Sequence, residues 1–80
     1  MPNPSHLRQS PQLVSLGGAI RTLRLAAGLS QEELAHLAEV DRSYLGRVER
    51  GDNNVAVMTL CQIARALDVS GAQLLELAQL

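Results

Sequence analysis

The chain has 80 residues and a mass of 8.6 kDa, from which we expect one small domain. Leu and Ala occupy 25 positions whereas Val, Ile and Thr occupy 10, and this helix-forming composition argues against a β-sandwich or a β-barrel. Seven Arg and eight acidic residues give a formal net charge of −1, which speaks against the strongly basic surface of most nucleic-acid-binding proteins.

The first twelve residues differ in composition from the rest of the chain. They contain all three prolines, Pro2, Pro4 and Pro11, and no apolar run of the kind that a signal peptide needs. Because proline disfavours a helix, we predict a flexible N-terminal arm over residues 1–12, from which Arg8 could reach a polyanion. The folded domain is predicted over residues 13–80.

Two helices are predicted in the first half of this domain. Apolar residues recur every three or four positions and form the stripe Leu13, Leu16, Ile20, Leu23 and Ala27. Gly28 is expected just past the end of this first helix. Ser30 and Glu33 have the spacing of a capping box, which predicts that a second helix of about two turns begins there.

Three more helices are predicted in the second half. Asp41 is the expected N-cap of a helix over residues 42–50, and residues 51–54 have the composition of a loop. The fourth helix carries the stripe Val57, Leu60, Ile63, Ala64 and Leu67. A second capping box, Ser70 with Gln73, begins the last helix. We therefore predict an all-α fold, a compact bundle of five short helices.

The two helices between Gln31 and Arg50 have the lengths and the spacing of a helix-turn-helix, and Ala35 is small enough to let them cross closely. The residues expected to be buried are Leu34, Ala38, Val40, Leu45 and Val48. The outward face of the second helix then carries Arg42, Ser43, Gly46, Arg47 and Arg50. Guanidinium groups on such a face suit the O6 and N7 atoms of guanine in the major groove of DNA.

These features occur together with three short motifs, Leu29-Ser30-Gln31, Leu34-Ala35 and Glu49-Arg50-Gly51. With them, residues 13–75 resemble the Cro/XRE, or lambda-repressor-like, family of DNA-binding domains. The resemblance implies a five-helix lambda-repressor-like bundle whose third helix enters the major groove. It also implies a bacterial or phage-encoded cytoplasmic protein that associates with the nucleoid.

The resemblance assigns roles to individual residues. It implies base contacts from Arg42, Ser43 and Arg47, and an internal salt bridge between Arg24 and Glu49. Contacts to the DNA backbone are expected from Gln31, Tyr44, Arg50, Asn53 and Asn54. Gln31 could instead brace a base-reading side chain, and Tyr44 could instead cover the edge of the core. If Arg24 neutralises Glu49, three arginines of the outward face remain uncompensated.

Three positions bear on the local geometry. The turn of the motif usually carries Gly in this family but carries Glu39 here, and a non-Gly residue in a left-handed turn is strained. Ala56 stands where a capping Ser or Thr often precedes the fourth helix, so that helix start is expected to be weaker. Gly46 either brings the backbone of the third helix closer to DNA or is tolerated at an exposed site.

The main hypothesis is a sequence-specific DNA-binding transcriptional regulator, a repressor or an autoregulatory controller, that binds a double-stranded operator as a homodimer. The dimer interface is predicted on the last helix, at Leu74, Leu77, Ala78 and Leu80. A stand-alone controller of a restriction–modification system and a phage-type repressor both fit the sequence. The alternative is a protein-interaction module, such as the DNA-binding antitoxin of a toxin–antitoxin pair.

Other chemistries are not expected. His6, His36 and Cys61 are too few and too scattered for a structural zinc site, and a single cysteine forms no intramolecular disulfide. The sequence has no cluster of nucleophile and base that would predict an enzyme, and no run of 18 apolar residues that would predict a membrane span. We therefore expect no cofactor, no metal, no small-molecule ligand and no membrane partner.

Overall fold

The first helix begins earlier than its apolar stripe predicts. The computed structural model describes residues 9–80, in which α1 spans Pro11–Ala26. Ser10 is its N-cap, and the Ser10 hydroxyl accepts a hydrogen bond from the Leu13 N–H at 3.2 Å. Proline suits the first position of a helix because the N–H that it lacks would have no partner there. Pro11 therefore starts a helix that it was expected to exclude.

The N-terminal arm was accordingly predicted too long at its C-terminal end. Residues 1–8 lie outside the described part of the chain. Gln9 is bound to the folded domain, because its backbone N–H donates to the Gly51 carbonyl at 2.7 Å. Residues 9–12 thus belong to the domain, and the boundary predicted after residue 12 is wrong.

Both predicted capping boxes form. Helix α2 spans Gln31–Ala38, where the Glu33 N–H donates to the Ser30 hydroxyl at 3.0 Å and the Ser30 N–H donates to the Glu33 carboxylate at 2.9 Å. Helix α5 spans Gly71–Leu77, and Ser70 and Gln73 exchange the same two bonds at 3.0 and 2.8 Å. Each box satisfies two backbone N–H groups that a helix start would otherwise leave to water, so the starts of α2 and α5 are confirmed.

The other two helices begin without a side-chain cap. Helix α3 spans Arg42–Arg50 and follows Asp41, which has the extended backbone of an N-cap but whose side chain makes no capping hydrogen bond. The expectation that the Asp41 side chain caps this helix is therefore wrong. Helix α4 spans Val57–Ala66 and follows Ala56, which has no side-chain oxygen to offer, as the sequence indicates.

The turn between α2 and α3 keeps its left-handed geometry without a glycine. Glu39 has φ 60° and ψ 43°, and its N–H donates to the His36 carbonyl at 3.2 Å. The next N–H, that of Val40, donates to the Ala35 carbonyl at 2.9 Å. These bonds satisfy the end of α2 and hold Glu39 in a conformation that its Cβ disfavours.

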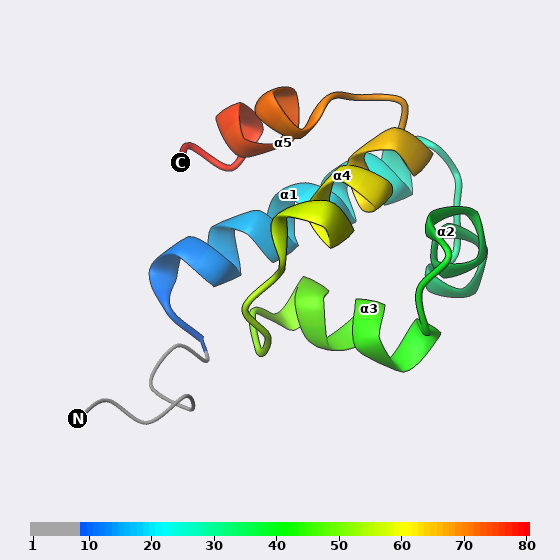
Figure 1. Ribbon diagram of the computed structural model, residues 1–80, viewed down its shortest axis with the longest axis horizontal. Helices are drawn as coiled ribbons and strands as arrows, with labels where there is room; N and C mark the ends of the chain where they lie inside the picture. Colours follow the sequence, from blue (N-terminus) through cyan, green and yellow to red (C-terminus); the bar gives the residue numbers. More distant parts are fainter. Residues whose placement is uncertain (1–8) are drawn as a thin grey trace.

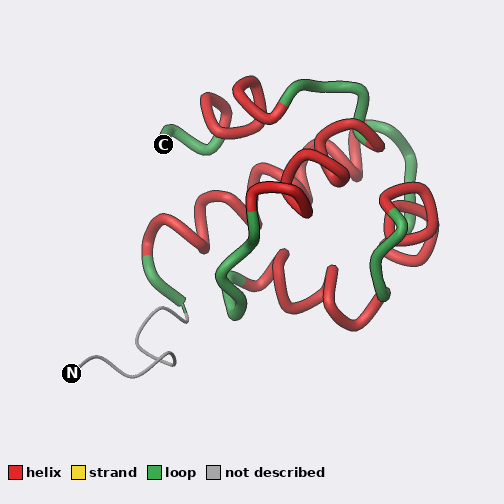
Figure 2. The backbone as a smooth tube through the Cα atoms, viewed as in Figure 1, coloured by secondary structure: helices red, strands yellow, loops and turns green. Residues whose placement is uncertain are grey.

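The five helices of residues 9–80 enclose one core (Figures 1 and 2). Helix α1 packs on α3 and α5, α2 packs on α3 and α4, and α4 packs on α5. The largest fully buried side chains come from all five helices: Ile20, Leu34, Leu45, Val48, Ile63 and Leu74. In Figure 1, α3 forms the lower edge of the bundle and α5 the upper edge. Within residues 9–80, none of the helices combines the length and hydropathy that crossing a bilayer requires.

The predicted dimer stripe on α5 is divided between two faces. Leu74 is completely buried and Ala78 is buried too, both in the core of their own chain. Leu77 and Leu80 are exposed, at 57% and 52% of their surface. The expectation that these four residues form one partly exposed stripe for a dimer is therefore wrong for Leu74 and Ala78, which attach α5 to the bundle.

Candidate nucleic-acid interface

Helix α3 has one face in the core and one face in solvent. Leu45 and Val48 are fully buried, as the sequence predicts, and they fix the rotation of the helix about its axis. Arg42, Ser43 and Arg47 are exposed. The three side chains that are expected to read bases are therefore accessible to a ligand. Helix α3 cannot rotate them inward without losing its core contacts.

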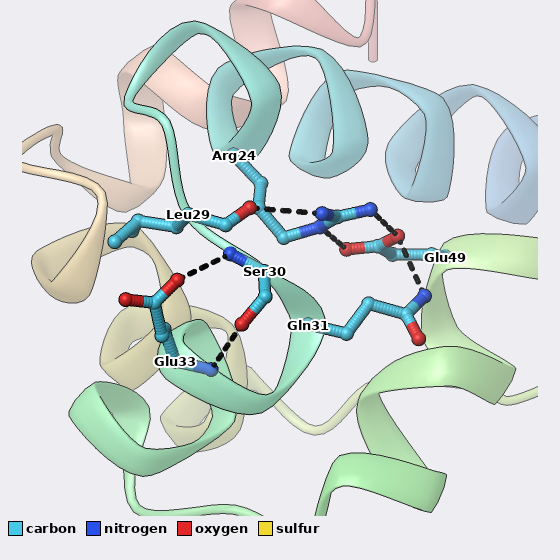
Figure 3. A network of polar contacts seen from close by, with 6 residues as sticks. All are labelled: Arg24, Leu29, Ser30, Gln31, Glu33 and Glu49. Carbon is cyan, nitrogen blue, oxygen red and sulfur yellow. Dashed lines mark hydrogen bonds and ion pairs between the residues drawn. The ribbon is translucent and has the colours of Figure 1, made fainter.

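The position of α3 is fixed by an ion pair with α1 (Figure 3). Arg24 Nε and Nη2 donate to the two carboxylate oxygens of Glu49, at 2.7 and 3.0 Å. The two side chains retain only 9% and 3% of their exposure. The hydrogen bond from Arg24 to Glu49 raises the pKa of Arg24, outweighing burial, which lowers it. The salt bridge implied by the family resemblance is thus formed, and its geometry is bidentate.

Two further hydrogen bonds extend this ion pair to α2. Arg24 Nη1 donates to the Leu29 carbonyl at 3.0 Å, just before the capping box of α2. Gln31 Nε2 donates to Glu49 Oε1 at 3.0 Å. Figure 3 shows the capping box and the ion pair side by side. Gln31, which was expected to contact a phosphate or to brace a side chain, is half-buried and braces Glu49.

Close contact between α1 and α3 also depends on Gly17. A Cβ on this residue would lie 2.4 Å from the Val48 carbonyl oxygen and 2.5 Å from that of Glu49, distances that no side chain could accept. Gly17 was not among the residues predicted from the sequence to have a role. A signal was present, since a glycine inside a helical apolar stripe often marks close packing.

Gly46 has neither of the two roles that the sequence suggested. It is buried, and its missing Cβ would lie 3.4 Å from Arg50 Nη1 and 3.7 Å from Gln31 Oε1. Gly46 is therefore covered by the side chains of Arg50 and Gln31. It is not an exposed site, and its backbone is not bare toward a ligand.

Arg47 lies between an aromatic ring and an amide. Its guanidinium carbon is 5.9 Å from the centre of the Tyr44 ring, a cation–π distance. The Asn53 amide is assigned, from its hydrogen-bond partners, the orientation in which Oδ1 accepts from Arg47 Nε at 3.2 Å and Nδ2 donates to the Asp52 carbonyl at 3.1 Å. The opposite amide orientation would set oxygen against a carbonyl and nitrogen against the guanidinium. Tyr44 is half-buried and also packs against the core.

Arg50 has a carboxylate partner, which the sequence did not lead us to expect. Its Nε donates to Asp52 at 3.1 Å, although the Arg50 side chain remains 62% exposed. Gln9 Nε2 donates to the Arg50 carbonyl at 2.9 Å and to the same aspartate. The expectation of three uncompensated arginines is therefore wrong: in residues 9–80, Arg42 and Arg47 are the outward-facing arginines of α3 that form no ion pair.

Comparisons with known proteins agree with this geometry. A helix-turn-helix family model matches residues 20–74. The chain is 43% identical over 56 residues to control protein C.SmaI of Serratia marcescens, covering 70% of this chain and 67% of that protein. It is 36% identical over 61 residues to control protein C.BamHI of Bacillus amyloliquefaciens, covering 75% of each.

A solved structure extends the similarity to the whole fold. The restriction-modification controller protein C.AhdI from Aeromonas hydrophila aligns with a TM-score of 0.79 and 48% identity, covering 81% of this chain and 98% of that one. The motifs, the α1–α3 ion pair and these likenesses lead to one conclusion. The chain belongs to the Cro/XRE family of helix-turn-helix transcription regulators.

Proposed function

We propose that this protein is a sequence-specific transcriptional regulator that binds a double-stranded DNA operator as a homodimer, with α3 in the major groove. The observation that carries the proposal is the outer face of α3. There Arg42, Ser43 and Arg47 are exposed, while the opposite face is locked to α1 and α2. A rigidly held helix with donors on its free face is what direct readout of base edges requires.

In this proposal, Arg42, Ser43 and Arg47 contact bases and a second group of residues contacts the DNA backbone. The backbone group consists of Gln31, Tyr44, Arg50, Asn53 and Asn54. Gln31 begins α2, where free N–H groups and the helix dipole favour a phosphate. Arg50 exchanges its exposed contact with Asp52 for a phosphate when DNA binds. Such contacts set the register of the protein on the duplex and carry no sequence information.

The charges predict how binding depends on salt. Arg24 is buried against Glu49, and Arg50 is paired with Asp52, so few cations remain for general attraction to a polyanion. Non-specific affinity is therefore weak, and the salt dependence of binding is shallow compared with that of a strongly basic domain. Specificity then relies on a few positioned arginines and on dimerisation.

Two observations support dimerisation and an autoregulatory role. Leu77, the last residue of α5, and Leu80 beyond it leave apolar surface exposed, which a second copy can cover. A dimer reads two half-sites about one helical turn, roughly 34 Å, apart. Control proteins recur among the relatives, which favours a controller of a restriction–modification system over a phage-type repressor. Such a controller responds to its own concentration through mass action.

The test begins with selection of bound duplexes from a random DNA pool, which yields the operator and its half-site spacing. Arg47→Ala is then expected to reduce the preference for operator over random duplex by about fivefold or more, since a bidentate arginine–guanine pair contributes about 1–3 kcal/mol. Arg65→Ala removes the same charge from the exposed surface of α4 and is the matched control. Fluorescence anisotropy measures both affinities.

Two outcomes would contradict the proposal. If the parent protein selects no common sequence, sequence-specific binding is wrong. If Arg47→Ala keeps the parent's preference for the operator, Arg47 does not read bases. Thermal unfolding, followed by circular dichroism, verifies that both arginine variants retain the fold.

A further inference from the structure

The contacts of Arg47 involve only part of its guanidinium. Asn53 Oδ1 accepts from Nε, and the Tyr44 ring lies to one side of the group. A guanidinium has five N–H groups, and the four on the two terminal nitrogens of Arg47 make no hydrogen bond within residues 9–80. Asn53 is itself anchored, because its amide nitrogen donates to the Asp52 carbonyl. Arg47 is thus contacted at Nε by an amide of the loop that follows α3.

This orientation restricts which nitrogens of Arg47 can reach a base. With Nε occupied, a paired contact must use the two terminal nitrogens, which offer donors alone. Guanine presents two acceptors, O6 and N7, side by side in the major groove. Adenine presents one acceptor beside a donor, and cytosine presents a donor, so neither matches two donors. The free end of Arg47 is therefore suited to guanine.

We infer that Asn53, with the Tyr44 ring, is a positioning residue that presents the terminal nitrogens of Arg47 to a guanine of the operator. This inference rests on the proposed function, in which Arg47 contacts bases. It adds to the proposed backbone contact of Asn53 a role in base choice. Asn54, the adjacent exposed amide, makes no hydrogen bond to Arg47 in residues 9–80 and has no such role.

The experiment uses the full chain and the selected operator, with each base pair of the half-site substituted in turn. Arg47→Ala first identifies the G·C pair whose preference depends on Arg47. Asn53→Ala is expected to lower the preference at that same pair by between about twofold and tenfold, the range for one lost hydrogen bond. Asn54→Ala, the matched control, lowers affinity for all sequences alike. Thermal unfolding confirms that each variant is folded.

Two further variants separate positioning from general binding. Asn53→Asp keeps an acceptor for Arg47 Nε, so it retains the G·C preference while repulsion from phosphates lowers affinity for every sequence. Asn53→Ala in an Arg47→Ala background causes no additional loss of base preference, because the side chain that it positions is absent.

The outcomes distinguish this inference from the proposed function. If Asn53→Ala lowers affinity uniformly, as Asn54→Ala does, the positioning role is wrong while base reading by Arg47 stands. The same conclusion follows if Asn53→Ala changes preference in the absence of Arg47. If Arg47→Ala changes no base preference at all, the proposed function itself is wrong at this residue.

Discussion

Arg24 and Glu49 are two charges that the fold removes from water together. Removing an ion from water costs several kcal/mol, and the bidentate contact with its added hydrogen bonds to Leu29 and Gln31 offsets that cost. A buried pair of this kind contributes little net stability compared with apolar residues of similar size. Each member nevertheless depends on the other, because either one alone would be a buried charge without its partner.

This dependence gives the first stability prediction. Arg24→Leu leaves the Glu49 carboxylate buried with Gln31 as its remaining donor, and we expect a loss of about 3–5 kcal/mol in the free energy of unfolding. The double variant Arg24→Leu, Glu49→Leu should lose less than either single variant. Urea denaturation measures all three. A double variant that loses the sum of the two single effects would contradict this account.

The exposed pair on the same helix is the control. Arg50 is 62% exposed, so its contact with Asp52 is weakened by solvent and by the mobility of a long side chain. Arg50→Ala is therefore expected to change the free energy of unfolding by about 1 kcal/mol or less. The contrast between the two arginines separates burial from charge as the cause of the large effect.

Glu39 supports a second prediction at the residue scale. The left-handed conformation of Glu39 costs about 1–2 kcal/mol for a residue with a Cβ. A glycine would avoid this cost, but its greater conformational freedom in the unfolded chain would cancel part of the gain. We expect Glu39→Gly to raise the free energy of unfolding by about 1 kcal/mol. Glu32→Gly, inside α2, removes the same charge and should lower it by about 1 kcal/mol. If both variants lost the same free energy of unfolding, backbone strain at Glu39 would be excluded.

Single residues differ in how far the sequence could predict them. The Arg24–Glu49 pair was predicted because the resemblance implies it, and strain at Glu39 was predicted because that residue stands where the family usually carries Gly. Gly46 was misinterpreted because its burial depends on Arg50 and Gln31 folding over it. The contact of Asn53 with Arg47 could not be predicted, because it depends on how the loop after α3 returns toward that helix.

At the scale of elements, α2 and α5 begin with the same capping box made from different side chains. Glu33 completes the first and Gln73 the second. Hydrogen bonds from the backbone N–H and then the hydroxyl of Ser30 lower the pKa of Glu33. Since this pKa is lower in the folded chain, the ionised box stabilises the fold above the unfolded pKa. That contribution is lost as the pH falls through the folded pKa.

Exchanging the two side chains tests this pH dependence. Glu33→Gln keeps a capping box but removes its titration, so its unfolding midpoint in urea should fall less than the parent's between neutral and acidic pH. Gln73→Glu is the reverse exchange and should make the midpoint fall more. The capping-box origin of the effect would be refuted if both variants followed the parent's pH profile.

The helix boundaries could be predicted from the sequence where the apolar period and the capping residues indicated the same start. The five helices of residues 9–80 occur in the predicted order, and two starts are marked by boxes. The errors lie at starts marked by a single residue. Proline is unfavourable inside a helix but favourable at its first position. Whether Pro11 prevents or begins a helix therefore depends on whether Ser10 before it acts as an N-cap. Asp41 has the backbone of an N-cap, and nothing in the sequence indicates that its side chain makes no bond.

At the scale of the whole molecule, α5 and the three residues after it must serve both the fold and the proposed dimer. It packs on α1 and α4, and this contact takes Leu74 and Ala78. An apolar period identifies a stripe but does not tell a core contact from a subunit contact, because both bury apolar surface. Of the predicted stripe, Leu77 and Leu80 are left for a partner. Helix α5 lies at the edge of the bundle opposite α3 (Figure 1).

This division makes the proposed dimer sensitive to one substitution that spares the core. Leu77→Asp would place a charge in the centre of the apolar contact, so we expect it to convert dimer to monomer in sedimentation velocity while the unfolding transition is retained. Leu37→Asp makes the same change on α2, at a residue equally exposed (55%), and should leave the dimer intact.

The monomer should then lose affinity for an operator with two half-sites but keep its weak affinity for one, since each α3 remains folded and the gain from linking two half-sites is gone. A Leu77→Asp protein that still sediments as a dimer would exclude α5 as the interface. A monomer that binds the full operator as tightly as the parent would show instead that dimerisation does not supply the affinity, and that a single α3 suffices.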